Sequence, residues 1–193
     1  MKKIFVVLII LFAHVNLFSQ STNPTDPSFI GIHAGTTFPA APTAFSEYYS
    51  LGFFGALTFD KALSNIFSVG ADASYAMYTI DGNNNTVTGD QLSFMSFTPY
   101  FKIGDNVGIR STSPFGRIGV GIGYTSKSNV LKNSSVIYAK ESAAGYSILL
   151  GAGIDIHLKT LDKITFEVSY RLNHIPGADY QGALIGFGYH FRL

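Results

Sequence analysis

The C-terminal residues 182–193 alternate strictly between two kinds of side chain, one hydrophobic and the other small or polar. Such alternation separates the two kinds onto opposite faces only in an extended strand. The pattern therefore predicts a β-strand with one apolar face. The apolar positions are Ile185, Phe187, Tyr189, Phe191 and Leu193, and those between them are Gly186, Gly188, His190 and Arg192.

The same alternation recurs along the chain and predicts eight strands. They cover residues 28–38, 48–59, 66–79, 92–103, 115–125, 145–158, 164–173 and 183–193. At ~3.3 Å per residue and a tilt of ~40°, a strand of about eleven residues spans ~27 Å, close to the apolar height of an outer-membrane barrel. The prediction is an all-β chain folded as an eight-stranded antiparallel up-and-down transmembrane β-barrel.

The connections between these strands alternate in length, as expected when both chain ends lie on one side of such a barrel. Short periplasmic turns are predicted at residues 60–65 and 159–162. The segment 104–114 should also be a short turn, so either the neighbouring strands extend into it or it is irregular. Longer, polar outer loops are predicted at residues 39–47, 80–90, 126–144 and 174–181.

Face assignment places large apolar side chains toward lipid and small or charged ones toward the lumen. The lumen of an eight-stranded barrel is just wide enough to be filled by side chains. The outward set is Ile30, Ile32, Phe38, Tyr49, Leu51, Phe53, Leu57, Phe59, Phe67, Val69, Tyr75, Ile118, Val120, Ile122, Tyr124, Tyr146, Ile148, Leu150, Ile154, Ile156, Ile164, Phe166, Val168, Tyr170 and Leu172. The inward set, apart from glycines, is His33, Asp72, Lys102, Arg117, Asp155, His157, Glu167, Arg171, His190 and Arg192.

The segment 92–103 breaks the alternation. Leu92 and Phe94 are out of phase with Phe97 and the apolar residues that follow it. A β-bulge, which inserts one extra residue into a strand, would restore the phase. We therefore expect a bulge near Met95.

Several inward positions are charged and define the main candidate site, a lumenal charge network. Buried charges left unpaired cost several kcal/mol each, so Glu167 and Arg171 are expected to form ion pairs with Arg117, Lys102 or Asp72 and to be coupled to each other. A conducting path is the alternative, although a lumen this narrow is normally plugged. The network residues are Asp72, Lys102, Arg117, Asp155, Glu167 and Arg171.

The composition agrees with a location in a membrane. Charged residues make up 13% of the chain, against about 25% in ordinary soluble domains, and aromatic residues reach 15%. There is no Cys, so no disulfide framework holds the fold and its stability must come from backbone pairing and packing.

The N-terminus reads as a secretory signal peptide over residues 1–20. Lys2 and Lys3 precede an apolar run at residues 4–13 and a polar exit, the arrangement of a cleaved signal. Cleavage is expected near Ser19 or Gln20, which leaves residues 21–193 as the barrel domain. The mature chain then carries 11 basic and 12 acidic residues, and this balance implies no nucleic-acid partner.

The strand pattern over residues 28–193 resembles the small eight-stranded outer-membrane barrels typified by the OmpA transmembrane domain and OmpX. The resemblance implies residence in the cell outer membrane as a monomer, with membrane lipid and lipopolysaccharide as neighbours. It also implies that the barrel-assembly machinery recognises the C-terminal strand through Tyr189, Phe191 and Leu193. Family members usually end in an aromatic residue, whereas this chain ends in Leu193, with Phe191 two positions earlier.

Catalytic and metal motifs are sparse, and no catalytic residue, metal or cofactor is expected. The segment 81–85 begins like a calcium loop, but Thr86 and Leu92 stand where glycine and glutamate are required. His33, His157 and His190 lie on different strands and are interpreted as lumenal hydrogen-bonding groups. His174 and Asp179 share a predicted outer loop, while Ser128, Ser134 and Ser135 lie in another.

Three function classes follow. The favoured one is a non-enzymatic outer-membrane barrel with a structural role, or one whose outer loops bind a ligand or surface outside the cell. The second is a lipid-modifying outer-membrane enzyme, which would need a His and Ser pair at the outer rim. The third is a secreted lipocalin-like lipid carrier, which would need an apolar lumen and a charged exterior, the reverse of the faces assigned above.

Overall fold

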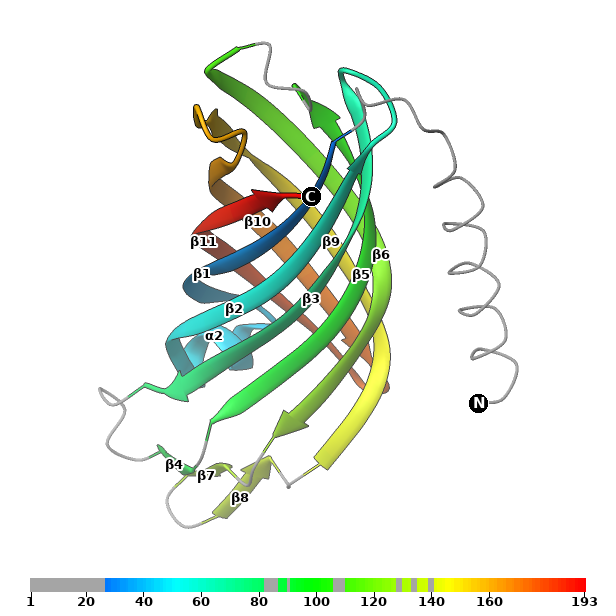
Figure 1. Cartoon of the computed structure of the whole chain (residues 1–193). Helices are drawn as coiled ribbons and strands as arrows, with labels where there is room; N and C mark the ends of the chain where they lie inside the picture. The colour runs from blue at the N-terminus through cyan, green and yellow to red at the C-terminus, as the bar shows by residue number, and fades with distance from the viewer. Residues whose placement is uncertain are drawn as a thin grey trace.

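The chain folds into one closed β-barrel in a computed structural model (Figure 1) that describes residues 27–81, 87–89, 91–105, 110–127, 130–132, 135–138 and 141–193. The predicted signal peptide, residues 1–20, lies outside the described residues. The order around the barrel is β1-β11-β10-β9-β6-β5-β3-β2. The strands are β1 (Ser28–Ala41), β2 (Tyr49–Ala62), β3 (Phe67–Ile80), β5 (Leu92–Gly104), β6 (Thr112–Lys127), β9 (Glu141–His157), β10 (Lys163–Ile175) and β11 (Ala178–Arg192).

Every neighbouring pair of barrel strands is antiparallel, and successive strands lie side by side. The barrel closes where β1 pairs with β11, from Phe29 opposite Arg192 to Ala41 opposite Gln181. The predicted eight-stranded up-and-down barrel is therefore confirmed.

Most strands are longer than predicted. β9 has 17 residues, about 56 Å of extended chain at ~3.3 Å per residue, more than a tilted strand needs to cross the ~25 Å apolar band of an outer-membrane barrel. β6 has 16 residues, and its start at Thr112 explains the poorly fitting segment 104–114, because the strand extends into it. The β6 and β9 hairpin therefore continues well past the lipid.

The two ends of the barrel differ. We call the end where β1 begins and β11 finishes the turn end, and the opposite end, which carries the longer connections, the loop end. At the loop end the short helix α2 (Thr43–Tyr48) lies inside the barrel mouth, and a small sheet of order β4-β7-β8 lies beyond the barrel (Figure 1). Its strands are β4 (Val87–Gly89), β7 (Val130–Lys132) and β8 (Ser135–Tyr138).

These loop-end elements were not predicted, because each is a short segment held by contacts made outside its own sequence. Within the described part of the chain, no helix has the length and hydropathy needed to cross a membrane.

The predicted outer loop at residues 174–181 is wrong. β10 and β11 continue to a tight turn in which Ile175 pairs with Ala178. Gly177 has φ of 86°, a conformation that glycine adopts without steric cost. Pro176 precedes it, and a Pro-Gly pair at these central positions is typical of a type II turn.

The assignment of the outward face is confirmed with one exception. All of the predicted outward side chains are exposed or half-exposed except Tyr49, which is buried in the lumen. The pairing of β2 with β3 shifts register between Tyr49 and Gly52. The extra residue reverses the alternation there, so that Tyr49 points inward while Leu51 and Phe53 point toward lipid.

The predicted bulge near Met95 is also wrong. β5 keeps one register through Met95, which pairs with Tyr75 on β3 and with Tyr124 on β6. Leu92 and Phe94 are buried, at 1% and 3% exposure. They are out of phase because they face the lumen, where they pack with other apolar side chains.

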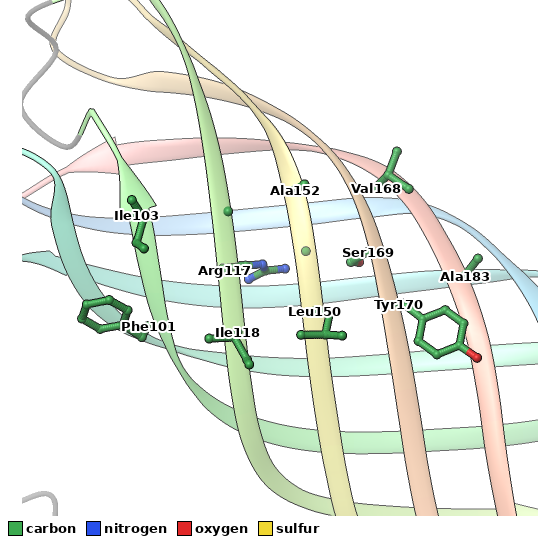
Figure 2. Close-up of a pocket in the computed structure, with 12 residues that line it drawn as sticks. Phe101, Ile103, Arg117, Ile118, Leu150, Ala152, Val168, Ser169, Tyr170 and Ala183 are labelled. Atoms are coloured by element: carbon green, nitrogen blue, oxygen red, sulfur yellow. The ribbon is translucent and has the colours of Figure 1, made fainter.

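The lipid face carries a shallow apolar hollow of about 530 Å³ across β5, β6, β9, β10 and β11 (Figure 2). Gly116 pairs with Ala152 at its floor, so little side chain fills it. Ile118, Leu150 and Tyr170 form one wall. Its apolar lining suits the hydrocarbon of a membrane.

Candidate functional site

The lumen at the turn end is filled by a cluster of buried charges around Lys163. Its Nζ lies 3.5 Å from Asp60 Oδ2 and 3.3 Å from Asp155 Oδ2. Lys102 donates to the same Asp155 oxygen at 2.6 Å, and Thr165 donates to the other at 2.6 Å. Tyr100 donates to Asp60 at 2.5 Å. Two lysines and two aspartates from four strands therefore neutralise one another at this end.

Two of the predicted lumenal histidines join this cluster. His33 and His190 face each other across the β1 and β11 seam, with their Nε2 atoms 2.8 Å apart, so one ring donates and the other accepts. His190 Nδ1 lies 3.5 Å from Asp60 without a hydrogen bond. Among the described residues no group of three or more carboxylates and imidazoles is placed to hold a metal ion. His157, in contrast, lies near Asp105 at the barrel rim.

The middle of the lumen holds the other four residues of the predicted network in one continuous chain. Arg117 binds Glu167 at 2.7 Å and lies 3.6 Å from Asp72. Arg171 binds the other oxygen of Asp72 at 2.8 Å and also donates to Ser74 and Ser96. Arg171 and Glu167 are thus linked through Asp72 and Arg117 rather than by a direct pair.

All six predicted network residues face the lumen, but they fall into two groups. Lys102 and Asp155 belong to the turn-end cluster, whereas the other four form the middle chain. Sequence reasoning missed Asp60 because it fell inside the predicted turn 60–65, and Lys163 because it follows the predicted turn 159–162 directly. The alternation of the strand could have revealed Asp60, because it lies two residues after the inward-facing Thr58 and so belongs to the same face.

The charges balance across these two layers. Four acidic and four basic side chains contact one another: Asp60, Asp72, Asp155 and Glu167 with Lys102, Arg117, Lys163 and Arg171. The cavity between the layers has a volume of about 10 Å³, room for one water at most. This arrangement blocks the lumen with fixed, mutually neutralised charges.

A third, apolar layer closes the loop end. Phe45 of α2 is 2% exposed and lies among rings from four strands. They belong to Tyr49, Tyr78, Phe94 and Tyr180. Leu92, Ala76 and Ile175 complete the cluster. Tyr78 also exchanges a 2.6 Å hydrogen bond with Thr37 at the base of this layer.

At the loop-end rim, the His174 ring hydrogen-bonds the Asp179 carboxylate through Nδ1 and stacks on Tyr146, with ring centroids 4.5 Å apart. Among the described residues no serine hydroxyl joins them. Ser128 and Ser134, like the segment 82–86 of the predicted calcium-like loop, lie outside the described residues, and of Ser135 only the backbone, in β8, is described. The rim therefore presents an imidazole and a carboxylate without a described nucleophile.

The C-terminal strand is tied to the turn before β10. Asp162 accepts a 3.0 Å hydrogen bond from the backbone N–H of Arg192 and a 2.7 Å bond from the Tyr189 hydroxyl. These donors, the backbone N–H first, hold the pKa of the Asp162 carboxyl below its usual value. Phe191 and Leu193 point outward, with 48% and 69% exposure.

The closed barrel, its apolar exterior and its filled polar lumen define an integral outer-membrane β-barrel. The chain belongs to the family of outer membrane protein beta-barrel domains, whose family profile matches residues 10–191. This family implies a location in the outer membrane.

The fold is shared with solved structures of other proteins. Neisserial surface protein A aligns with a TM-score of 0.63 at 8% identity, covering 86% of this chain and 97% of that one. The N-terminal β-barrel domain of Pseudomonas aeruginosa OprF gives 0.50 at 13% identity, covering 84% and 97%. The outer membrane enzyme PagL aligns with a TM-score of 0.49 at 14% identity, covering 83% of this chain and 97% of that one. A likeness at this level says nothing about activity. No curated protein sequence matches the chain.

Proposed function

We propose that this protein is a non-enzymatic outer-membrane barrel whose loop end faces outside the cell. The barrel either supports the envelope or binds another surface through its loop end. One observation carries the proposal: the lumen is closed at three levels, while the strands continue past lipid at the loop end and bear the β4-β7-β8 sheet. A barrel of this kind offers no route through its body. Its contact with the surroundings is made by its loops.

The orientation can be tested because the chain has no native cysteine. Thr88→Cys introduces a thiol in β4 and Thr160→Cys places one at the turn end. A membrane-impermeant maleimide applied to intact cells should label the β4 thiol and should reach the turn-end thiol only after permeabilisation. Labelling with the opposite preference would overturn the proposed orientation.

The role is tested by separating barrel from loops. A variant in which a short Gly-Ser linker replaces residues 128–140 keeps all eight barrel strands. If the role is surface binding, this variant should restore envelope resistance to detergent in a deletion strain but should not restore cell aggregation or attachment to glass. If the role is structural, attachment should not differ between the strains. Loss of a lipid-hydrolysis product in the deletion strain, restored by the barrel, would instead reveal an enzyme.

A further inference from the structure

The loop-end layer has two unlike halves. On one side, the ring of Phe45 lies 4.8 Å from Tyr78, 5.3 Å from Tyr180, 5.7 Å from Tyr49 and 6.2 Å from Phe94, measured between centroids. Most of these contacts are edge-on, the arrangement that aromatic rings prefer. This half is a pocket for one aromatic ring, and the protein fills it with its own.

The element that supplies this ring is weakly held. α2 has six residues, its N-cap residue Pro42 makes no side-chain cap hydrogen bond, and its first turn has no acidic residue. Helices this short have no stability of their own in water, and Phe45 is the buried residue of α2. Phe45, the partly buried Tyr48 beside it and a 3.0 Å hydrogen bond from the Asp81 N–H to the Tyr48 carbonyl therefore keep α2 in the barrel mouth.

The other half of the layer has polar atoms without partners. Thr125 Oγ1, Ser147 Oγ and Asn173 Oδ1 are buried and make no hydrogen bond, and their residues are only 1%, 0% and 7% exposed. Buried polar atoms are nearly always hydrogen-bonded, so a group of orphans indicates a missing partner.

These orphans adjoin the aromatic half. Thr125 lies directly across from Phe94, while Asn173 lies between Ser147 and Tyr180 in the pairing. Directly opposed residues on antiparallel strands have Cα atoms about 4.5 to 5.5 Å apart. A planar ligand in the aromatic half would thus have these oxygens within reach.

We propose that the loop-end layer is a binding site for a small aromatic molecule bearing a hydroxyl or amino group, of the phenol class. Its ring takes the place of Phe45 when α2 swings out, and its polar group bonds the orphaned oxygens of Thr125, Ser147 and Asn173. The charged layers below block onward passage, so the molecule is bound from the loop end and not transported. Phe45 is then an internal competitor for the site.

The test uses phenol and toluene as probes with folded, full-length protein in nanodiscs. Binding is measured by titration of backbone amide shifts around the lumen. Phe45→Ala empties the ring pocket, and apolar cavities of about 150 Å³ bind benzene, so this variant should bind phenol at least tenfold more tightly than the wild type. The matched control is Phe53→Ala, which removes a lipid-facing ring with 58% exposure and should behave as the wild type.

A second arm tests the polar wall. In the Phe45→Ala background, Ser147→Ala and Asn173→Leu should each weaken phenol binding up to about tenfold, the range of one hydrogen bond, and should leave toluene binding within twofold. Equal phenol affinity in the Phe45 and Phe53 variants would overturn the proposal, because it would show partition into lipid only. Phenol and toluene affected alike by the polar variants would overturn it too, since the orphans would then hold only water.

Folding of each variant is checked by the heat-dependent mobility shift on a gel. If Phe45→Ala does not fold, Phe45→Leu keeps an apolar side chain and should show intermediate affinity for phenol. Failure of both to fold would make α2 a structural part of the barrel and would reject the proposal.

Discussion

Arg171 on β10 and Asp72 on β3 form a 2.8 Å ion pair across the lumen, between strands that are not neighbours in the sheet. Asp72 also faces Arg117, which in turn binds Glu167. The pair therefore braces opposite walls of the barrel.

Arg171→Met should destabilise the barrel by about 3 to 5 kcal/mol, because it leaves Asp72 buried with a weakened partner set. Adding Asp72→Asn should recover part of this loss, and adding Glu167→Gln should recover less, since Glu167 bonds Arg117 instead. Double-mutant cycles by urea unfolding in detergent micelles measure both couplings. The exposed Arg110→Met serves as control, and strictly additive Arg171 and Asp72 effects would contradict the pairing.

An arginine on the lipid face should destabilise the barrel more in the middle of the membrane than near its surface. Val120 is 61% exposed in the middle of β6, and Tyr124 lies on the same face nearer the loop end. Val120→Arg should cost about 2 to 4 kcal/mol in lipid vesicles, and Tyr124→Arg about 0 to 1 kcal/mol if it lies at the interface. Equal costs at both positions would place the membrane boundary elsewhere.

Gly121, which follows Val120 and faces the lumen, should not tolerate a larger side chain either. A Cβ added there would lie 2.0 Å from the carbonyl oxygen of Phe97, a distance at which the two strands would have to separate. Gly121→Ser should therefore destabilise the barrel as well. Only the arginine effect should depend on membrane depth.

Stability should fall at acid pH through Asp162. A carboxyl whose pKa is lowered on folding stabilises the fold at pH above its unfolded value, about 3.9, and this contribution is lost as the pH falls through the folded-state pKa. The wild type should therefore lose stability below about pH 4, relative to Asp162→Asn. Urea midpoints between pH 7 and pH 2 measure the difference, and parallel pH profiles of the two proteins would contradict the role of Asp162.

Purified wild-type protein in planar bilayers should show no stable, porin-like conductance. Phe45→Ala should remain closed as well, because the two charged layers still block the lumen. Steady nanosiemens openings from monomers of either protein would show that the charge network moves aside.

The C-terminal signal should matter for assembly more than for stability. Phe191 faces outward and its ring packs on Tyr189 at 4.8 Å. Phe191→Ser should lower the amount of folded protein in cells several-fold while leaving refolding in detergent nearly unchanged. Phe187→Ser on the same face of β11 is the control, and an equal loss for both would indicate a general apolar requirement.

The strands and faces were predictable because alternation is a local signal that every strand repeats. The alternation was misleading at Phe94 and Tyr49, because the sequence does not distinguish an inward aromatic side chain from an outward one. Only their neighbours across the lumen show that they point inward. Asp60 and Lys163 were hidden by their closeness to turns. α2 and the β4-β7-β8 sheet could not be predicted, because contacts distant in sequence hold them in place.

The seam between β1 and β11 joins the first and last strands of the barrel, and the backbone N–H of Leu193 bonds the Ser28 carbonyl at 2.9 Å. This closing contact has the greatest sequence separation in the sheet, so it carries the largest loop-closure entropy and should form late. His190 lies on the strand that closes the ring, beside a cluster in which Asp60 on β2 meets Lys163 on β10 across the seam strands. Closure of the seam and charge neutralisation are thus coupled, and insertion should be a cooperative, nearly all-or-none event.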